Sequence, residues 1–224
     1  MEILLDYTLK EMQEKLVAMG EQKYRAKQIY TGLYQGKSFN EMSNISEKLK
    51  QKLIENFNAQ PVQIIDKKFS VDGTVKFLYK LHDNNIIEGV LMKYKYGYTL
   101  CVSTQVGCRM RCAFCASGLD GLIRNLSAGE ILGQVTEVNQ FLEGSLKEER
   151  KITNIVLMGS GEPLDNYDNV KKFINLVNDE NGLNISERNI SLSTCGLVEK
   201  IYQLADDDLQ ITLTISLHAP FDAM

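Results

Sequence analysis

The sequence predicts an α/β protein in which a partial (βα) barrel of parallel strands follows a small helical domain and a short β segment. Apolar residues recur at helical spacing in residues 1–60, β-branched and aromatic residues dominate residues 61–98, and strand-like and helix-like segments alternate from residue 99 onward. This alternation is typical of βαβ units that build a parallel sheet. We therefore expect a helical N-terminal accessory domain at 1–60, a β-rich connecting segment at 61–98 and an α/β core at 99–224.

Three short helices are expected in the N-terminal domain. Thr8 and Glu11 have the spacing of a capping box, which predicts a helix over about residues 8–19. Apolar residues at helical spacing predict two more helices, at 23–35 and 46–57.

The connecting segment reads as antiparallel strands. Residues 62–81 contain two strand-like runs separated by Asp72-Gly73, a dipeptide typical of tight hairpin turns. Residues 86–94 predict one more strand, and KYKYGY at 93–98 predicts a turn or linker into the core.

The core contains four expected strands and three expected helices in alternation. The strands are expected at 100–105, 152–159, 189–194 and 211–218, and the helices at 127–142, 167–179 and 197–206. The last strand has no covering helix in the sequence, so we expect an incomplete barrel of about four βα units, truncated before its C-terminal part. An uncovered edge strand is a site of aggregation, which we expect for this polypeptide alone.

The composition indicates an ordinary globular protein. Hydrophobic residues make up 44% and charged residues 24% of the 224 positions. No apolar run approaches the roughly 20 residues that span a bilayer, and the first residues lack the features of a signal peptide. We expect a cytoplasmic protein with no membrane contact, in which the five cysteines stay reduced and serve as metal ligands or catalysts.

The charge is distributed unevenly. The net charge is −4, but residues 1–99 carry 15 basic and 12 acidic side chains, against 10 and 17 in residues 100–224. A local basic group could bind phosphate, although scattered solvated charge is an equal alternative. Its members are Arg109, Arg111, Arg124, Lys93 and Lys95.

Four of the five cysteines lie between Cys101 and Cys115. Three of them, Cys108, Cys112 and Cys115, form C-x3-C-x2-C between the first core strand and the next helix. A structural zinc site takes four protein ligands, whereas three thiolates fill three corners of a [4Fe-4S] cluster and leave one iron open. An open iron suits S-adenosyl-L-methionine, because the amino and carboxylate groups of the methionine part can chelate it. We therefore favour a [4Fe-4S] cluster with S-adenosyl-L-methionine over zinc or an unrelated group of thiols.

Polar residues follow the later core strands. GSGEP at 159–163 comes after the second strand, and its Glu162 can accept a hydrogen bond from a bound ammonium. Ser193 ends the third strand, and Ser216 and His218 end the fourth. Ligand sites of parallel α/β folds gather at these strand ends, so we expect these residues to form one shared binding site. The alternatives are that GSGEP is an ordinary turn and that His218 is a structural histidine.

With these residues placed, the chain resembles the RlmN-type dual-specificity methyltransferases, radical SAM enzymes that methylate carbon 2 of adenosine in 23S rRNA and tRNA. The resemblance extends over essentially the whole chain and rests on specific phrases. These are YRAKQIYTGLYQ, FNEMSNISEKLK, CVSTQVGC, the cysteine motif, RNLSAGEILGQV, MGSGEPLDN, LSTCG and SLHAP.

The resemblance implies a role for each matching position. The cluster ligands would be Cys108, Cys112 and Cys115, and the residues that bind S-adenosyl-L-methionine would be Gly161, Glu162, Ser193, Ser216, Leu217 and His218. Glu88 matches the proton acceptor, and Cys101 matches the thiol that resolves a covalent RNA–enzyme intermediate. Cys195 matches no functional position, so we expect it to pack in the interior.

The resemblance also implies a mechanism that uses two molecules of S-adenosyl-L-methionine per turnover. The first methylates a cysteine near the family's C-terminus, and the second yields a 5′-deoxyadenosyl radical that removes a hydrogen atom from that methyl group. The carbon radical then adds to adenine, and Cys101 helps to release the product through a transient disulfide bond. No cysteine follows Cys195, so we expect the polypeptide, taken as a fragment, not to complete methyl transfer.

The implied partners are 23S rRNA at the peptidyl transferase centre, tRNA at the adenosine 3′ of the anticodon, and an electron donor such as flavodoxin or ferredoxin. The family suggests a monomer. The related Cfr-type enzymes, which methylate carbon 8, are an alternative, but GEPL at 161–164 favours carbon 2. A catalytically inactive RNA-binding fragment is a second alternative. The basic N-terminal part supports it, whereas the retained cluster cysteines, Glu88 and Cys101 argue against it.

Overall fold

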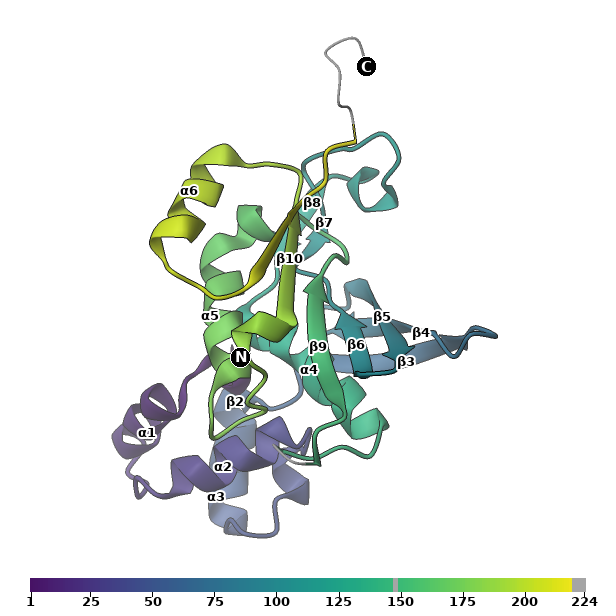
Figure 1. The fold of residues 1–224 in the computed structure, drawn as a ribbon. Coiled ribbons are helices and arrows are strands. Elements are labelled where there is room, and N and C mark those ends of the chain that lie inside the picture. Colours follow the sequence, from purple (N-terminus) through teal and green to yellow (C-terminus); the bar gives the residue numbers. More distant parts are fainter. Residues whose placement is uncertain (147–148, 219–224) are drawn as a thin grey trace.

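A seven-stranded mixed sheet forms the centre of the molecule, in a computed structural model that describes residues 1–146 and 149–218 (Figure 1). The last six residues of the expected core, 219–224, lie outside the described residues. The strand order is β11-β10-β9-β6-β5-β4-β3. Three N-terminal helices pack below the sheet in the view of Figure 1, and further helices lie beside it. No helix in the described part of the chain is long and apolar enough to cross a membrane.

The three expected N-terminal helices are present. They are α1 (Leu9–Ala18), α2 (Arg25–Tyr34) and α3 (Glu47–Asn56). The capping box is confirmed, because the Glu11 amide donates to the Thr8 hydroxyl at 3.2 Å and the Thr8 amide donates to the Glu11 carboxylate at 2.7 Å. These bonds satisfy amide groups that the first helical turn leaves without partners.

The helical domain shares its hydrophobic core with the rest of the chain. Tyr30 and Tyr34 on α2 are fully buried, and the Tyr34 hydroxyl donates to the Leu176 carbonyl at 2.9 Å. The domain is also closed by a short parallel pair, β1 (Glu2–Ile3) with β2 (Phe57–Asn58), which the sequence does not predict because two residues give no periodic signal. Its position relative to the core is therefore set by buried contacts rather than by a linker.

The strands of the connecting segment continue directly into the core sheet. An antiparallel meander of four strands leads to it: β3 (Val62–Phe69), β4 (Val75–Leu81), β5 (Ile86–Tyr94) and β6 (Gly97–Cys101). The expected hairpin around Asp72-Gly73 joins β3 to β4. The expected turn or linker at 93–98 is a tight hairpin in which Tyr94 pairs with Gly97.

Strand β6 joins the two kinds of sheet. It is antiparallel to β5 on one side and parallel to β9 (Ile152–Leu157) on the other, and β10 (Ile190–Thr194) and β11 (Thr212–Ile215) continue in parallel. The sequence prediction of a parallel α/β core is confirmed. Between these strands run α4 (Ala128–Phe141), α5 (Tyr167–Asn178) and α6 (Val198–Asp206), as the alternation predicts. At the sheet edge, all four residues of β11 are exposed.

A hairpin that the sequence does not predict encloses the cysteine motif. Strand β7 (Gln105–Gly107) pairs with β8 (Leu122–Asn125), and the motif lies in the loop between them. Each strand is too short for a recognisable alternation. The hairpin separates the cysteine loop from the main sheet while keeping both of its ends in place.

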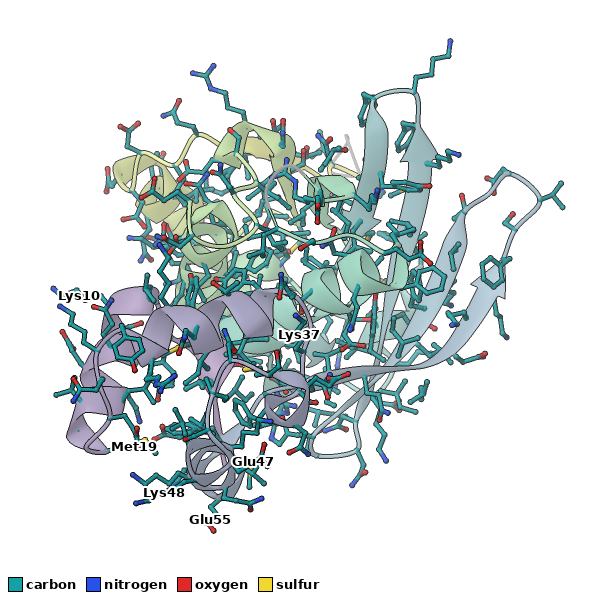
Figure 2. The ribbon with its side chains drawn as sticks, turned by 90° about the horizontal axis from the view of Figure 1, so that it is seen from below. Lys10, Met19, Lys37, Glu47, Lys48 and Glu55 are labelled. Atoms are coloured by element: carbon teal, nitrogen blue, oxygen red, sulfur yellow. The ribbon has the colours of Figure 1, made fainter. Side chains whose placement is uncertain are left out.

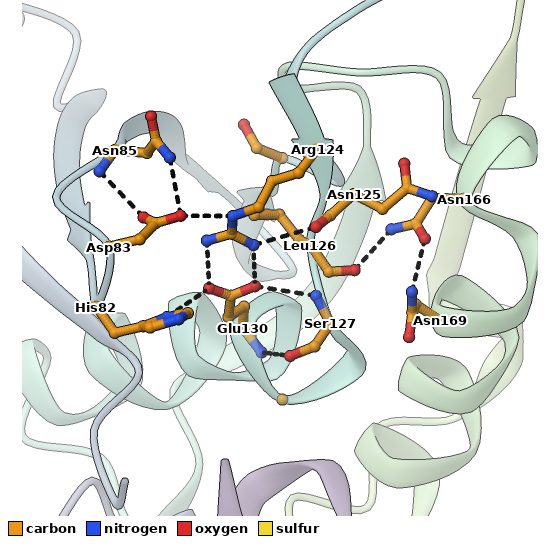
Figure 3. A network of polar contacts seen from close by, with 12 residues as sticks. His82, Asp83, Asn85, Arg124, Asn125, Leu126, Ser127, Glu130, Asn166 and Asn169 are labelled. Atoms are coloured by element: carbon orange, nitrogen blue, oxygen red, sulfur yellow. Dashed lines mark hydrogen bonds and ion pairs between the residues drawn. The ribbon is translucent and has the colours of Figure 1, made fainter. Parts of the chain in front are cut away.

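Strand β8 is held by Arg124, which lies in a polar network rather than in an open phosphate-binding surface (Figure 3). Its two Nη atoms donate to the Glu130 carboxylate at 2.7 and 2.8 Å, and its Nε donates to Asp83 at 2.6 Å. Glu130 is 1% exposed, accepts from the Ser127 amide and contacts His82. The hydrogen bond from Arg124 also holds the pKa of Asp83 well below its usual range. Neither alternative that the sequence left open for Arg124, a phosphate-binding patch or a solvated charge, describes it, because its charge is paired with Glu130 and Asp83.

We expect Arg124→Ala to lower the free energy of unfolding by about 3 kcal/mol, because it leaves the buried Glu130 carboxylate without its cation. Urea denaturation of the metal-free chain measures this loss. Arg188→Ala removes an exposed arginine and should change stability by less than about 0.5 kcal/mol. Equal effects of the two substitutions would contradict the assigned role of Arg124.

Candidate functional site

One face of the sheet carries polar side chains from several strands. Val90 pairs with Cys101 across β5 and β6, and Cys101 pairs with Val156 across β6 and β9. Residues directly opposite each other share a face, as do residues two positions apart on one strand. Glu88 therefore lies on the same face as Cys101. The register of β9 with β10 pairs Val156 with Ser191, and this places Ser193 on that face too.

The opposite face of the same strands is apolar and covered. Leu100, Leu157 and Leu192 are fully buried in the core with side chains of α4 and α5. The helices thus cover one face, and the polar face stays open for binding.

The cysteine loop depends on a close contact at its base. The Cys108 amide donates to the Gly121 carbonyl at 3.0 Å, and Gly107 has a φ of +76°. A Cβ at Gly107 would lie 2.0 Å from the Gly121 oxygen, so only glycine fits there. Within the loop, the Cys115 amide donates to the Cys112 carbonyl at 2.9 Å, in a turn that brings these two residues together.

A cavity of about 300 Å³ lies between the cysteine loop and the ends of β9, β10 and β11. Phe114 of the loop reaches across it, with its ring centroid 4.3 Å from that of His218. The hydroxyls of Ser193 and Ser216 are 3.0 Å apart. The cavity is lined by most of the residues that the sequence singles out, namely Cys108, Cys112, Cys115, Gly161, Glu162, Ser193, Ser216 and His218.

Glu162 is held rigidly at the cavity wall. It is 4% exposed, and its two carboxylate oxygens accept from the Leu164 amide at 3.0 Å and the Cys195 amide at 2.9 Å. A carboxylate has about four acceptor positions, so two remain for a bound ammonium or hydroxyl. Gly161 makes this arrangement possible, because a Cβ there would lie 2.5 Å from the Gln105 Cβ.

Three of the candidate residues are not in the cavity lining. Leu217 is 69% exposed. Glu88 forms an ion pair with Lys76 at 2.7 Å, and both side chains are about half exposed. Cys101 is half-buried, and burial raises the pKa of its thiol. Glu88 and Cys101 nevertheless face the same side of the sheet as Ser193.

The structure contradicts the sequence prediction for Cys195. Instead of packing in the interior, it is exposed and lines the cavity together with the three motif cysteines. Desolvation at the cavity wall and the Glu162 carboxylate raise the pKa of its thiol to about 12. Its position two residues after Ser193, at the end of a core strand, is the signal that could have placed it at the site.

The donor set fits an iron–sulfur cluster better than a single metal ion. A cubane attaches each cysteine to a different iron, so its three sulfurs do not have to converge on one position as the ligands of a zinc ion do. Three thiols on one cavity wall, facing a carboxylate and two serine hydroxyls, suit a cluster with an adjacent polar ligand.

Comparisons with known proteins agree with this arrangement. Residues 102–223 match the radical SAM superfamily, and residues 3–59 match the ribosomal RNA large subunit methyltransferase N-terminal domain. The "Probable dual-specificity RNA methyltransferase RlmN" of Clostridium novyi (strain NT) is 53% identical over 98% of this chain and 63% of that protein. The protein of the same name from Clostridium perfringens (strain 13 / Type A) is 56% identical over 99% of this chain and 63% of that protein.

A solved structure shares the fold. The crystal structure of a radical SAM methyltransferase from Sphaerobacter thermophilus superposes with a TM-score of 0.92 at 38% identity, over 100% of this chain and 65% of that one. The chain thus spans somewhat less than two thirds of the length of the relatives that it matches.

We expect Gly107→Ala to loosen the base of the cysteine loop, because its methyl group would collide with the Gly121 carbonyl. Gly121→Ala is the matched control: Gly121 also has positive φ, +72°, but no atom lies within 4 Å of the new Cβ. The control should cost only about 1 kcal/mol of backbone strain. Hydrogen exchange of the Cys108 amide should be faster in Gly107→Ala and little changed in Gly121→Ala. Equal protection in both variants would contradict this account.

We expect Glu162→Gln to speed alkylation of Cys195 by iodoacetamide severalfold at mildly alkaline pH. Removing the carboxylate charge lowers the raised pKa of the thiol and increases the thiolate fraction, while desolvation keeps part of the shift. Peptide mapping by mass spectrometry follows Cys195 in the metal-free chain. Glu199→Gln, at an exposed carboxylate, should leave the rate unchanged. A slower reaction in Glu162→Gln would show that the carboxylate does not raise this pKa.

Proposed function

Because this chain belongs to the radical SAM superfamily and carries the N-terminal domain of ribosomal RNA large subunit methyltransferases, we propose that it forms all or part of an RlmN-type RNA methyltransferase. The proposed reaction is methylation of carbon 2 of adenosine in 23S rRNA and tRNA, with S-adenosyl-L-methionine as methyl donor. The observation that carries the proposal is the single cavity that brings three motif cysteines together with Glu162, Ser193 and Ser216.

Residues of the cavity have distinct proposed roles. Cys108, Cys112 and Cys115 hold a [4Fe-4S] cluster, which when bound supplies the electron for reductive cleavage of S-adenosyl-L-methionine. Glu162 accepts the ammonium of the methionine part through its free acceptor positions. The remaining proposed binding residues are Gly161, Ser193, Ser216, Leu217 and His218.

Glu88 and Cys101 act on the RNA rather than on the cofactor. We assign Glu88 as the proton acceptor and Cys101 as the thiol that releases the product through a transient disulfide with a second cysteine. Their common sheet face with Ser193 supports this assignment. The raised pKa of Cys101 keeps its thiol protonated at neutral pH, so formation of the disulfide requires a base to remove the proton.

The helical domain at 1–60 is the proposed RNA-binding accessory domain. Figure 2 shows Lys10, Lys37 and Lys48 on its outer surface, and each of these side chains is exposed. Exposed lysines make phosphate contacts that do not depend on base sequence. Glu47 and Glu55 lie on the same domain, so its surface is mixed rather than uniformly basic.

The proposed partners also include an electron donor such as flavodoxin or ferredoxin, because cluster chemistry of this kind consumes an electron from outside. The protein would act in the cytoplasm as a monomer. A low-potential reductant and free thiols both require the reducing conditions found there.

We expect each of Cys108→Ala, Cys112→Ala and Cys115→Ala to lose most of the iron and the visible absorption that the unchanged chain binds after anaerobic reconstitution. Cys195→Ala is the matched control, since it removes a thiol from the same cavity but should keep both signals. The unchanged chain reduced by dithionite should also form 5′-deoxyadenosine from S-adenosyl-L-methionine.

Two outcomes would contradict the proposal: retention of the cluster in all three variants, or tetrahedral zinc in place of iron. Mass spectrometry of RNA treated with a protein of the relatives' full length then locates the methyl group. Methylation at carbon 8 would replace the carbon-2 assignment with the Cfr-type activity.

A further inference from the structure

The cysteine loop forms a wall between two cavities. Cys108, Met110 and Cys112 line the cavity that faces the sheet. The residues between them, Arg109 and Arg111, instead line a second cavity of about 490 Å³ on the other side of the loop. Successive residues of the loop therefore face opposite sides, and the second cavity lies outside the proposed cofactor site.

The charge of this outer cavity is positive. Its lining consists of the two arginines with Gly121 and Leu122, so both of its charged residues are cationic. The Arg109 side chain is 58% exposed, and its Nε lies 2.8 Å from the Asp165 carboxylate in an ion pair. The two Nη atoms of Arg109 keep their N–H groups for other acceptors. Arg111 is exposed and has a φ of +52°, an unusual backbone conformation for a side chain of this size. The loop's own acidic residue, Asp120, is exposed but does not line the cavity.

Apolar side chains lie beside the two arginines. Leu122 lines the cavity with them, and Leu119, which is 82% exposed, directly follows Gly118, whose backbone packs against Arg111. Arginine together with exposed apolar side chains is typical of protein–protein interfaces. The base of this surface is rigid, because β8 is held by the ion pairs of Arg124.

We propose that Arg109, Arg111, Leu119 and Leu122 form the docking surface for an acidic electron-donor protein that carries a flavin or a low-potential iron–sulfur centre. The inference rests on the proposed function. Reductive cleavage takes one electron: the donor is oxidised by one electron, the sulfonium carbon–sulfur bond breaks, and methionine and a 5′-deoxyadenosyl radical are formed. Arg111 directly precedes Cys112, with about 3.8 Å between the two Cα atoms, so a partner bound at Arg111 contacts the loop that carries the cluster ligands. Electron transfer rates fall steeply with distance, so docking on this loop suits a donor.

The position of the surface distinguishes the donor from RNA. An adenine that reacts must reach the inner cavity and the sheet face that carries Glu88 and Cys101. The two arginines line the cavity on the other side of the loop. A donor docked there would not compete with the RNA base, and the two could be bound at the same time.

The experiment measures how fast the reconstituted chain's cluster is reduced by flavodoxin hydroquinone, followed by anaerobic stopped-flow absorption. We expect Arg109→Glu/Arg111→Glu to slow this reduction at least roughly tenfold, because the attractive charge is reversed. Reduction by dithionite, a small molecule that needs no docking surface, should stay within about twofold. The matched control, Lys93→Glu/Lys95→Glu, makes the same charge change on the β5–β6 hairpin and should leave both rates unchanged.

If Arg109→Glu/Arg111→Glu binds less iron than the unchanged chain, its slower reduction could reflect loss of the cluster, and two further measurements separate these causes. Arg109→Gln/Arg111→Gln removes the charge without reversing it, and its rate is normalised to the cluster content. In the unchanged chain, reduction by flavodoxin should slow as salt is added, because screening weakens steering between opposite charges.

The proposal is overturned if flavodoxin reduces the arginine variants as fast as the unchanged chain, or if the lysine control is slowed equally. It is also overturned if salt has no effect, or if the arginine variants lose tRNA affinity in filter binding while keeping the flavodoxin rate, which would make the surface an RNA contact. Failure of the proposed function has a different signature: the unchanged chain would show no cluster absorption and no reduction by dithionite.

Discussion

The structure depends on how backbone hydrogen bonds are completed where the chain leaves β6. Strand β6 has partners on both sides, but beyond Val102, whose amide still donates to the Val156 carbonyl, the chain departs from the sheet, and its buried amides and carbonyls need other partners. The Ser160 carbonyl and buried amide side chains provide them. Gln134 on α4 accepts from the Ser103 amide and donates to the Ser103 carbonyl, both at 2.9 Å. Asn166 donates to the carbonyls of Thr104 and Leu126 at 2.8 Å, which ties the two ends of the loop hairpin together.

These bonds give the cysteine loop a rigid support although it lies outside the main sheet. Gln105 continues the same support, because its side chain donates to Asn125 on β8 and accepts from the Glu162 amide. The hairpin, the loop after β9 and the helix α4 are thus connected through polar side chains that are themselves buried. Unpaired polar groups in such positions would be costly, so the network holds one arrangement of the cavity walls.

The same support explains why the two sides of the loop differ in chemistry. Toward the sheet, Cys195 meets the buried Glu162 carboxylate, and desolvation together with that negative charge raises the pKa of its thiol. Away from the sheet, Arg111 faces solvent, and Arg109, although its Nε pairs with Asp165, keeps its other N–H groups for a partner. A loop of this kind can hold a cofactor on one side while it presents a recognition surface on the other.

Local signals account for what could be predicted. Capping residues, hairpin dipeptides and apolar periodicity depend on neighbours within a few positions, so the helices and most strands follow directly from the sequence. Ligands gather at the carboxyl ends of parallel strands, and this rule predicted one shared site for four polar residues. The cavity is lined by all of them: Glu162, Ser193, Ser216 and His218. The β7–β8 hairpin escaped prediction because short strands are stabilised by their partners rather than by their own pattern.

By itself the sequence determined the order of elements, the parallel core and the spacing of three thiols, since each of these is encoded over a short stretch of chain. Only the tertiary structure decided that the connecting strands extend the core sheet, that Arg124 pairs with a buried carboxylate and that Cys195 faces the cavity. These outcomes depend on contacts between residues far apart in the chain. The partner of an arginine or the exposure of a cysteine is set by which distant segments pack beside it, and no local pattern specifies that packing.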